Sequence, residues 1–177
     1  DVIGESGEST EISFSNTPVL LEEVGEDFSV LNTSYLNGEL SVYSSDEPID
    51  SQNDTDSTIV SSEELSVFIS IDDISSSNGS QVSIPINLTG SSNLLSMQGS
   101  IVFDPSVLSY KYVEGFNLPG LSLSNFGVSQ IDVGVLTYSW FDSSLESVDI
   151  SDNIEVFNIV FDVIGESGES SEISFSN

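Results

Sequence analysis

The sequence of 177 residues lacks cysteine, histidine, arginine and alanine, and it contains a single lysine, Lys111. Without histidine or cysteine there is no Ser–His–Asp triad, no thiol nucleophile and no ordinary zinc site. Thirty acidic residues against that one lysine give a formal net charge of −29. Such a polyanion cannot neutralise phosphates, so nucleic acids and anionic membrane surfaces are excluded as partners.

The residue types that remain are typical of a β protein. The strong helix formers Ala, Arg and Lys together supply one residue, whereas Ser, Val, Ile, Phe, Thr and Tyr are separated by Gly, Asn and Asp. Hydrophobic residues make up 37% of the chain, which is enough for a core and argues against disorder. The length suits one domain, or one module with part of a neighbour.

Apolar and polar residues alternate in several short segments, as in half-buried strands. Between two of these segments, residues 44–64 are polar, acidic and interrupted by Pro48, so they are interpreted as a linker. Short strands separated by turn residues predict an antiparallel β-sandwich or jelly roll. The predicted strands are 11–16, 39–44, 65–71, 81–90, 97–105, 107–115, 134–142 and 154–165.

The first sixteen residues, DVIGESGESTEISFSN, recur almost unchanged as residues 162–177. The two copies differ only at Thr10, which corresponds to Ser171, and they are offset by 161 residues. Repetition at a fixed period indicates a tandem array of similar modules. We therefore expect this sequence to be part of a longer repetitive protein.

Three stretches resemble cohesin modules. Residues 67–90, VFISIDDISSSNGSQVSIPINLTG, resemble the two opening strands; residues 97–118 resemble the next segment, with its Phe-Asp-Pro; and residues 154–177 resemble the later strands. The resemblance implies an all-β jelly roll of about nine strands per module. It also implies a last strand after residue 177, and NGELSVY at 37–43 is similar to that strand.

The resemblance therefore divides the chain into three parts. Residues 1–43 are expected to be the C-terminal strands of one cohesin-like module, 44–64 an acidic linker, and 65–177 the body of the next module. The segment 1–43 either folds back onto its own chain or completes a neighbouring unit by strand addition. In the second case, four apolar residues form an inter-unit strand that inserts into a body made by 65–161: Ile12, Phe14, Leu40 and Val42.

Two acidic stretches are candidate calcium sites, because carboxylate and amide oxygens are the ligands that Ca²⁺ prefers. Neither stretch has the ordered loop of an EF-hand, and the alternative interpretation is a solvated acidic surface. Calcium is thus the one candidate cofactor. The candidate ligands are Asp46, Asp50, Asn53, Asp54 and Asp56 in the linker, and Asp149, Asp152 and Glu155 further on.

The segment VLTYSWF places Leu136, Tyr138 and Trp140 on one face of a predicted strand. The favoured interpretation is a core face or an inter-module contact, and the alternative is a row of rings that stacks on sugars. Adjacent carboxylates such as Asp72 and Asp73 point to opposite faces of a strand, so they cannot act as a catalytic pair. We predict that the protein is not an enzyme.

These observations favour a non-enzymatic extracellular or cell-surface structural protein. Tandem cohesin-like repeats would form a rod or filament whose partners are copies of the same chain, joined in one version by strand exchange. One alternative is a scaffold module that binds dockerins, and another is a carbohydrate-binding adhesin. A dockerin-binding assay and a glycan array distinguish these hypotheses.

Overall fold

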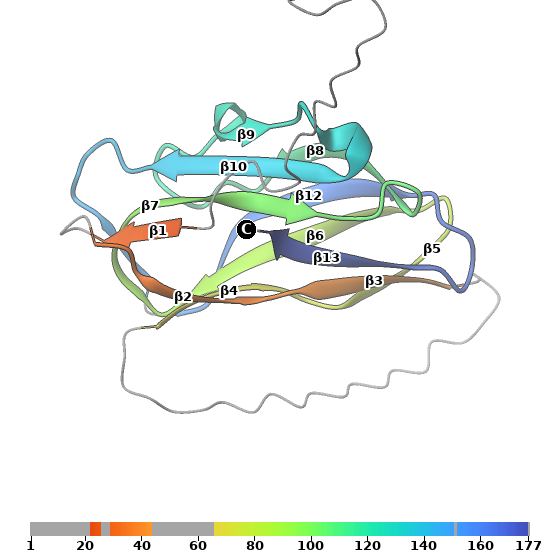
Figure 1. Ribbon diagram of the computed structural model, residues 1–177, viewed down its shortest axis with the longest axis horizontal. Coiled ribbons are helices and arrows are strands. Elements are labelled where there is room, and N and C mark those ends of the chain that lie inside the picture. The colour runs from red at the N-terminus through yellow and green to blue at the C-terminus, as the bar shows by residue number, and fades with distance from the viewer. Residues whose placement is uncertain (1–21, 26–28, 44–65, 151, 177) are drawn as a thin grey trace, which may run out of the picture.

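Two β-sheets packed face to face make up the fold of residues 22–25, 29–43, 66–150 and 152–176, which are the residues that the computed structural model describes (Figure 1). The β-sandwich predicted from the sequence is confirmed, and it has the jelly-roll form of the cohesin-like modules that the sequence resembles. Within the described ranges, no helix has the length and apolar character needed to cross a lipid bilayer.

Thirteen strands and two one-turn 3-10 helices follow one another along the described residues. Their bounds are β1 Glu22–Gly25, β2 Asn32–Leu36, β3 Gly38–Tyr43, β4 Ser66–Ile71, β5 Ile74–Ser77, β6 Gln81–Thr89, β7 Ser91–Val102, β8 Leu108–Glu114, η1 Leu123–Asn125, β9 Phe126–Gly127, η2 Ile131–Val133, β10 Val135–Phe141, β11 Val148–Ile150, β12 Ile154–Val163 and β13 Ser170–Ser176.

The first sheet has the order β5-β3-β13-β7-β10-β9, and the short strands β1 and β11 also pair with β7. The second sheet has five strands in the order β2-β4-β6-β12-β8. Most neighbours are antiparallel, as predicted. The exceptions among the described strands are the parallel pairs β2–β4 and β3–β5.

These two parallel pairs account for two of the strands beyond the nine expected. One extended segment runs through β2 and β3, and a second runs beside it through β4 and β5, so each passes from one sheet to the other (Figure 1). The backbones approach closely where they cross. A Cβ on Gly38 would lie 2.7 Å from Cγ2 of Ile71 and 2.8 Å from the backbone oxygen of Asp72, so only glycine fits there.

The core forms between the sheets from alternate residues of each strand, as the period of two requires. Trp140, Phe157 and Phe161 are the largest fully buried side chains. The rings of Phe103 and Phe161 meet edge to face with centroids 4.8 Å apart. Burial of each such side chain contributes about 1.5–3 kcal/mol, so the sandwich is held together mainly by its aromatic and aliphatic interior.

The early strands close the sandwich formed by the later ones. In β3, Leu40 is 0% and Val42 is 4% exposed, and both belong to the main core cluster. The strand pairs with β13 on one side and β5 on the other, within the same chain. Ile12 and Phe14, the other two residues of the predicted inter-unit strand, lie outside the described residues.

Candidate functional site

Two neighbouring strands of the first sheet, β7 and β10, and the last three residues of a third, β13, form a surface without charged side chains. In β7, Met97 and Ile101 point into the core, so the residues between them point outward. The same alternation orients β10 and the end of β13. We call this surface the uncharged face; its exposed or half-buried residues are Ser96, Gln98, Val102, Thr137, Ser139, Phe141, Ser174 and Ser176, and between them lie the buried Ser100 and Val135, which are 0% and 5% exposed.

The rows of this face are set by the strand register. Ser100 of β7 pairs with Thr137 of β10 on one side and with Ser176 of β13 on the other. One row further, Val102 pairs with Val135 and with Ser174. One row across the three strands therefore consists of hydroxyl-bearing side chains, and the next consists of two valines and a serine.

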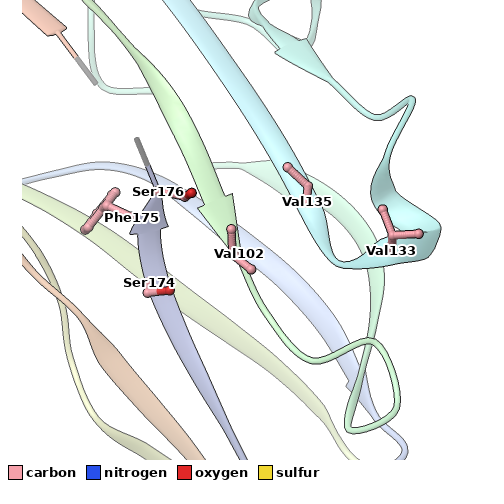
Figure 2. A pocket seen from close by; sticks show the side chains of 6 residues that line it. All are labelled: Val102, Val133, Val135, Ser174, Phe175 and Ser176. Atoms are coloured by element: carbon pink, nitrogen blue, oxygen red, sulfur yellow. The ribbon is translucent and has the colours of Figure 1, made fainter. Parts of the chain in front are cut away.

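A shallow hollow of about 390 Å³ opens at the end of the face where the valines lie. Figure 2 shows Val102 on β7 between β13 and the side chains of Val133 and Val135. Val133 is 67% exposed. The remaining lining residues are Ser174, Phe175 and Ser176. This hollow can receive an apolar side chain from a partner, with serine hydroxyls at its rim.

Electrostatics set the uncharged face apart from the rest of the molecule. Neither β7 nor β10 contains an acidic or basic residue, although the chain carries a formal charge of −29. The single base, Lys111, lies on the other sheet, where its Nζ is 2.9 Å from Oδ2 of Asp162. The hydrogen bond from Lys111, together with one from Gln81, holds the pKa of the Asp162 carboxyl below its usual value.

A buried polar cluster lies on the core side of the same strands. Glu23 of β1 is 1% exposed, and its Oε2 accepts a hydrogen bond of 2.7 Å from the hydroxyl of Tyr35. Burial raises the pKa of Tyr35, and the bond to Glu23 raises it further. Burial likewise raises the pKa of Tyr138, and the negative charge of Glu23 adds to that rise. The sequence pattern did not reveal this cluster, because nothing in EEVG marks Glu23 as an interior residue.

The carbohydrate-binding alternative is wrong in the form predicted from the aromatic segment. Tyr138 and Trp140 are each 2% exposed, and Leu136 is 0% exposed. The Nε1–H of Trp140 donates a hydrogen bond of 2.8 Å to the backbone oxygen of Pro119. These rings are therefore core residues, as the favoured interpretation held, and no sugar can stack on them.

The candidate calcium ligands fall into two groups. Oδ1 of Asp149 accepts a hydrogen bond of 2.8 Å from the backbone N–H of Asn93, while Oε1 of Glu155 accepts one from Nδ2 of Asn158. Asp152 is exposed. Among the described residues, no three carboxylates come close enough together to hold a metal ion. The linker residues Asp46, Asp50, Asn53, Asp54 and Asp56 lie outside the described residues, so calcium there stays a prediction.

Comparison with known proteins identifies the same fold. The profile of the cohesin domain matches residues 67–177. The sixth cohesin of scaffoldin B from Acetivibrio cellulolyticus, solved in complex with a mutant Cel5 dockerin, is 26% identical with a TM-score of 0.52, over 62% of this chain and 80% of that one.

Two further solved cohesins are similar at 19% identity and over 62% of this chain, which supports the fold alone. The CaDoc0917–CaCohA2 complex has a TM-score of 0.53 over 81% of that chain. The seventh ScaB type I cohesin from Pseudobacteroides cellulosolvens has a TM-score of 0.50 over 75% of its chain. No protein of curated function matches the sequence.

Proposed function

The chain belongs to the cohesin domain family, and on that premise we propose that it is a scaffold module that binds a dockerin-type protein. Cohesin domains are non-catalytic binding modules, so the chain is not an enzyme. Cohesins are typically extracellular or cell-surface modules of scaffoldins, and we assign this chain to the same location.

The observation that carries the proposal is the uncharged face. Interface cores are depleted in charged residues relative to the rest of a protein surface. On a chain with thirty acidic residues, β7, β10 and the last three residues of β13 form adjoining segments without charged side chains, where a partner can dock without desolvating carboxylates on those segments. The hollow beside Val102 and Val135 adds a recess for one apolar anchor residue.

Calorimetric titration of the chain with a panel of dockerins tests this proposal. We expect at least one dockerin to bind, and we expect Ser139→Arg, an exposed change on the uncharged face, to weaken that binding about tenfold or more. The matched control is Ser83→Arg, an equally exposed change on the other sheet, which should leave affinity unaltered. Failure of every dockerin to bind, or equal loss in both variants, would contradict the proposal.

A second candidate function, a tandem surface rod or filament, is favoured by the repeated sixteen residues. Copies 161 residues apart that differ at one position are expected of a chain built from many similar modules. The partners in such an assembly are further copies of the chain, linked covalently or by strand exchange. Electron microscopy of a chain with three periods should show straight rods with a regular repeat, whereas irregularly bent beads would contradict it.

A further inference from the structure

The last strand, β13, occupies a slot between β3 and β7. Residues 170–173 pair with 41–38 of β3, and residues 174–176 pair with 102–100 of β7. Ile173 is buried in the core, with 1% of its surface exposed. The ring centroids of Phe175 and Tyr35 are 5.3 Å apart. The slot therefore requires an extended segment with two apolar side chains spaced two residues apart.

Polar contacts add further requirements for the occupant of the slot. The hydroxyl of Ser171 accepts a hydrogen bond of 2.9 Å from the backbone N–H of Asp104. At the turn before the strand, the N–H of Gly168 donates to the backbone oxygen of Val42 at 2.9 Å, with φ of +94°. That backbone conformation favours glycine. The slot thus selects glycine, then a hydroxyl, then two apolar residues, at fixed spacing.

Residues 1–16 of this chain meet every one of these requirements. With the offset of 161, Gly7 corresponds to Gly168, Ile12 to Ile173 and Phe14 to Phe175. The single difference puts Thr10 in place of Ser171, which keeps the hydroxyl. Residues 1–16 lie outside the described residues, so the match is one of sequence. The chain contains two segments whose sequences fit the slot, and the described residues form one such slot.

The register of β13 and β1 on β7 is compatible with residues 1–16, the first copy of the repeat, lying in the slot just before β1. β13 ends with Ser176 opposite Ser100, and β1 begins with Glu22 opposite Gln98. Two residues along a strand span about 7 Å. The five residues 17–21 that join the first copy to β1 cover that gap easily. A first copy in the slot would therefore continue along β7 directly into β1.

We propose that residues 1–43 of one molecule dock on the body of a second copy of this chain, with Ile12 and Phe14 in the slot of β13. The acceptor's own β1, β2 and β3 leave its body to make room for those of the donor, and its own β13 is displaced, with its contacts replaced one for one by those of the first copy. This proposal rests on the second candidate function, the surface rod, and it does not involve dockerin binding. The donor and acceptor surfaces differ, so the contact is head-to-tail and builds an open filament wherever the rotation between units does not close a ring.

The contacts are equivalent in the two states, so their balance depends on concentration and on the tether between segments. A strand tethered to its own body has a high effective concentration there, whereas a neighbour becomes competitive when molecules are crowded or linked in an array. We therefore expect exchange between chains to rise with protein concentration.

Disulfide trapping tests the proposal, since the natural sequence has no cysteine. Ser174 lies opposite Val102, so S174C/V102C in one chain is the control for geometry. The test mixes two single variants, S13C and V102C, which are unfolded together, refolded and oxidised. We expect a mixed disulfide dimer, identified by peptide mass, whose fraction increases with concentration. The proposal is overturned if the control cross-links and the mixture does not.

Apolar-to-serine variants provide a second, independent measurement. If the first copy fills the slot, I173S/F175S keeps the wild-type urea midpoint and sediments as oligomers, whereas the quadruple variant with I12S/F14S loses folding. If I173S/F175S unfolds as readily as the quadruple variant, residues 1–16 do not fill the slot. If it stays folded but monomeric, the exchange occurs within one chain and the intermolecular joint is wrong.

Discussion

Asn37 and Phe175, which are 138 residues apart in sequence, are joined by a hydrogen bond of 3.1 Å from the backbone N–H of Phe175 to Oδ1 of Asn37. The Nδ2 of Asn37 also donates to Oε1 of Glu172 at 3.2 Å. Asn37 stands between β2 and β3, where the chain passes from one sheet to the other. One amide side chain therefore ties this crossing point to the last strand.

Replacement of Asn37 should weaken the closure of the sandwich. Asn37→Ala removes both hydrogen bonds and should lower the free energy of unfolding by about 1 kcal/mol in urea titrations. Asn37→Asp keeps the acceptor for Phe175 but faces Glu172 with like charge, so its cost should be greater at pH 7 than at pH 3. Ser34→Ala, an exposed change on β2, is the control. Equal midpoints for Asn37→Ala and the control would contradict the role assigned to Asn37.

Gly134, just before β10, is expected to be the least replaceable of the positive-φ glycines. Its φ is +78°, and a Cβ there would lie 2.1 Å from the backbone oxygen of Phe103. Gly120, with φ of +71° and nothing within 4 Å of a Cβ, isolates the backbone strain alone. Gly120→Ala should cost about 1–2 kcal/mol. Gly134→Ala should cost more, as measured by urea unfolding followed by tryptophan fluorescence, and equal costs would rule out the steric clash.

Trp140→Phe should destabilise the protein by about 3 kcal/mol. The change leaves a void in the core and removes the donor to the backbone oxygen of Pro119. Phe141→Ala is the matched control, because the neighbouring Phe141 is 51% exposed on the opposite face of β10. It should shift stability by no more than about 0.5 kcal/mol. Circular dichroism is the appropriate probe, since Trp140 is the only tryptophan; a similar loss in both variants would contradict this assignment.

Asp142 should contribute a pH-dependent part of the stability. The backbone N–H of Ser144, and then its hydroxyl, hold the pKa of the Asp142 carboxyl below its usual value. Because the folded-state pKa is depressed, the stabilisation is fully present above the unfolded pKa of about 3.9 and is lost as pH falls through the lower folded value. Urea midpoints between pH 2 and 6 should therefore depend less on pH in Asp142→Asn than in the wild type. The exposed Asp152→Asn should keep the wild-type profile, and identical profiles for all three proteins would refute this.

Calcium binding by the linker is open to a direct test. If residues 46–56 hold Ca²⁺ through the predicted carboxylates, millimolar calcium should raise the melting temperature, and a chelator should reverse the rise. Asp50→Asn combined with Asp54→Asn should abolish that difference. Asp149→Asn with Asp152→Asn probes the second stretch separately. An equal effect of sodium at matched ionic strength would show screening of the net charge instead of a site.

Sequence reasoning recovered the fold because each strand is locally consistent with it. The alternation around Trp140 and Phe161, and the Asp-Pro turn after Phe103, predict the strands that the structure contains. The prediction was less accurate for β7, which begins at Ser91 instead of residue 97. Asn93, with φ of +59°, and the surrounding serines have the composition of a turn, although tertiary pairing with β11 keeps them in a strand.

The candidate site was less predictable than the fold. Thr137 and Ser139 are visible in the sequence as one side of a strand, but their grouping with Gln98 and Ser176 depends on strand order and register. Those relations join residues far apart in sequence and leave no local signal. The Glu23–Tyr35 pair was missed for a different reason. A carboxylate inside the core contradicts the usual burial pattern, so Glu23 was not expected to be buried.

The parallel pairs β2–β4 and β3–β5 also determine how the module responds to mechanical force. Ser66 lies beside Asn32 at one end of this double pair, and Tyr43 lies beside Ser77 at the other. The eleven steps from Ser66 to Ser77 span about 36 Å in an extended chain. When residues 1–43 of a donor sit on the body of an acceptor, a pull transmitted through Tyr43 of the donor and Ser66 of the acceptor acts along the strands in opposite directions. The interstrand hydrogen bonds are then loaded in shear, so they share the force at the same time and do not break one after another.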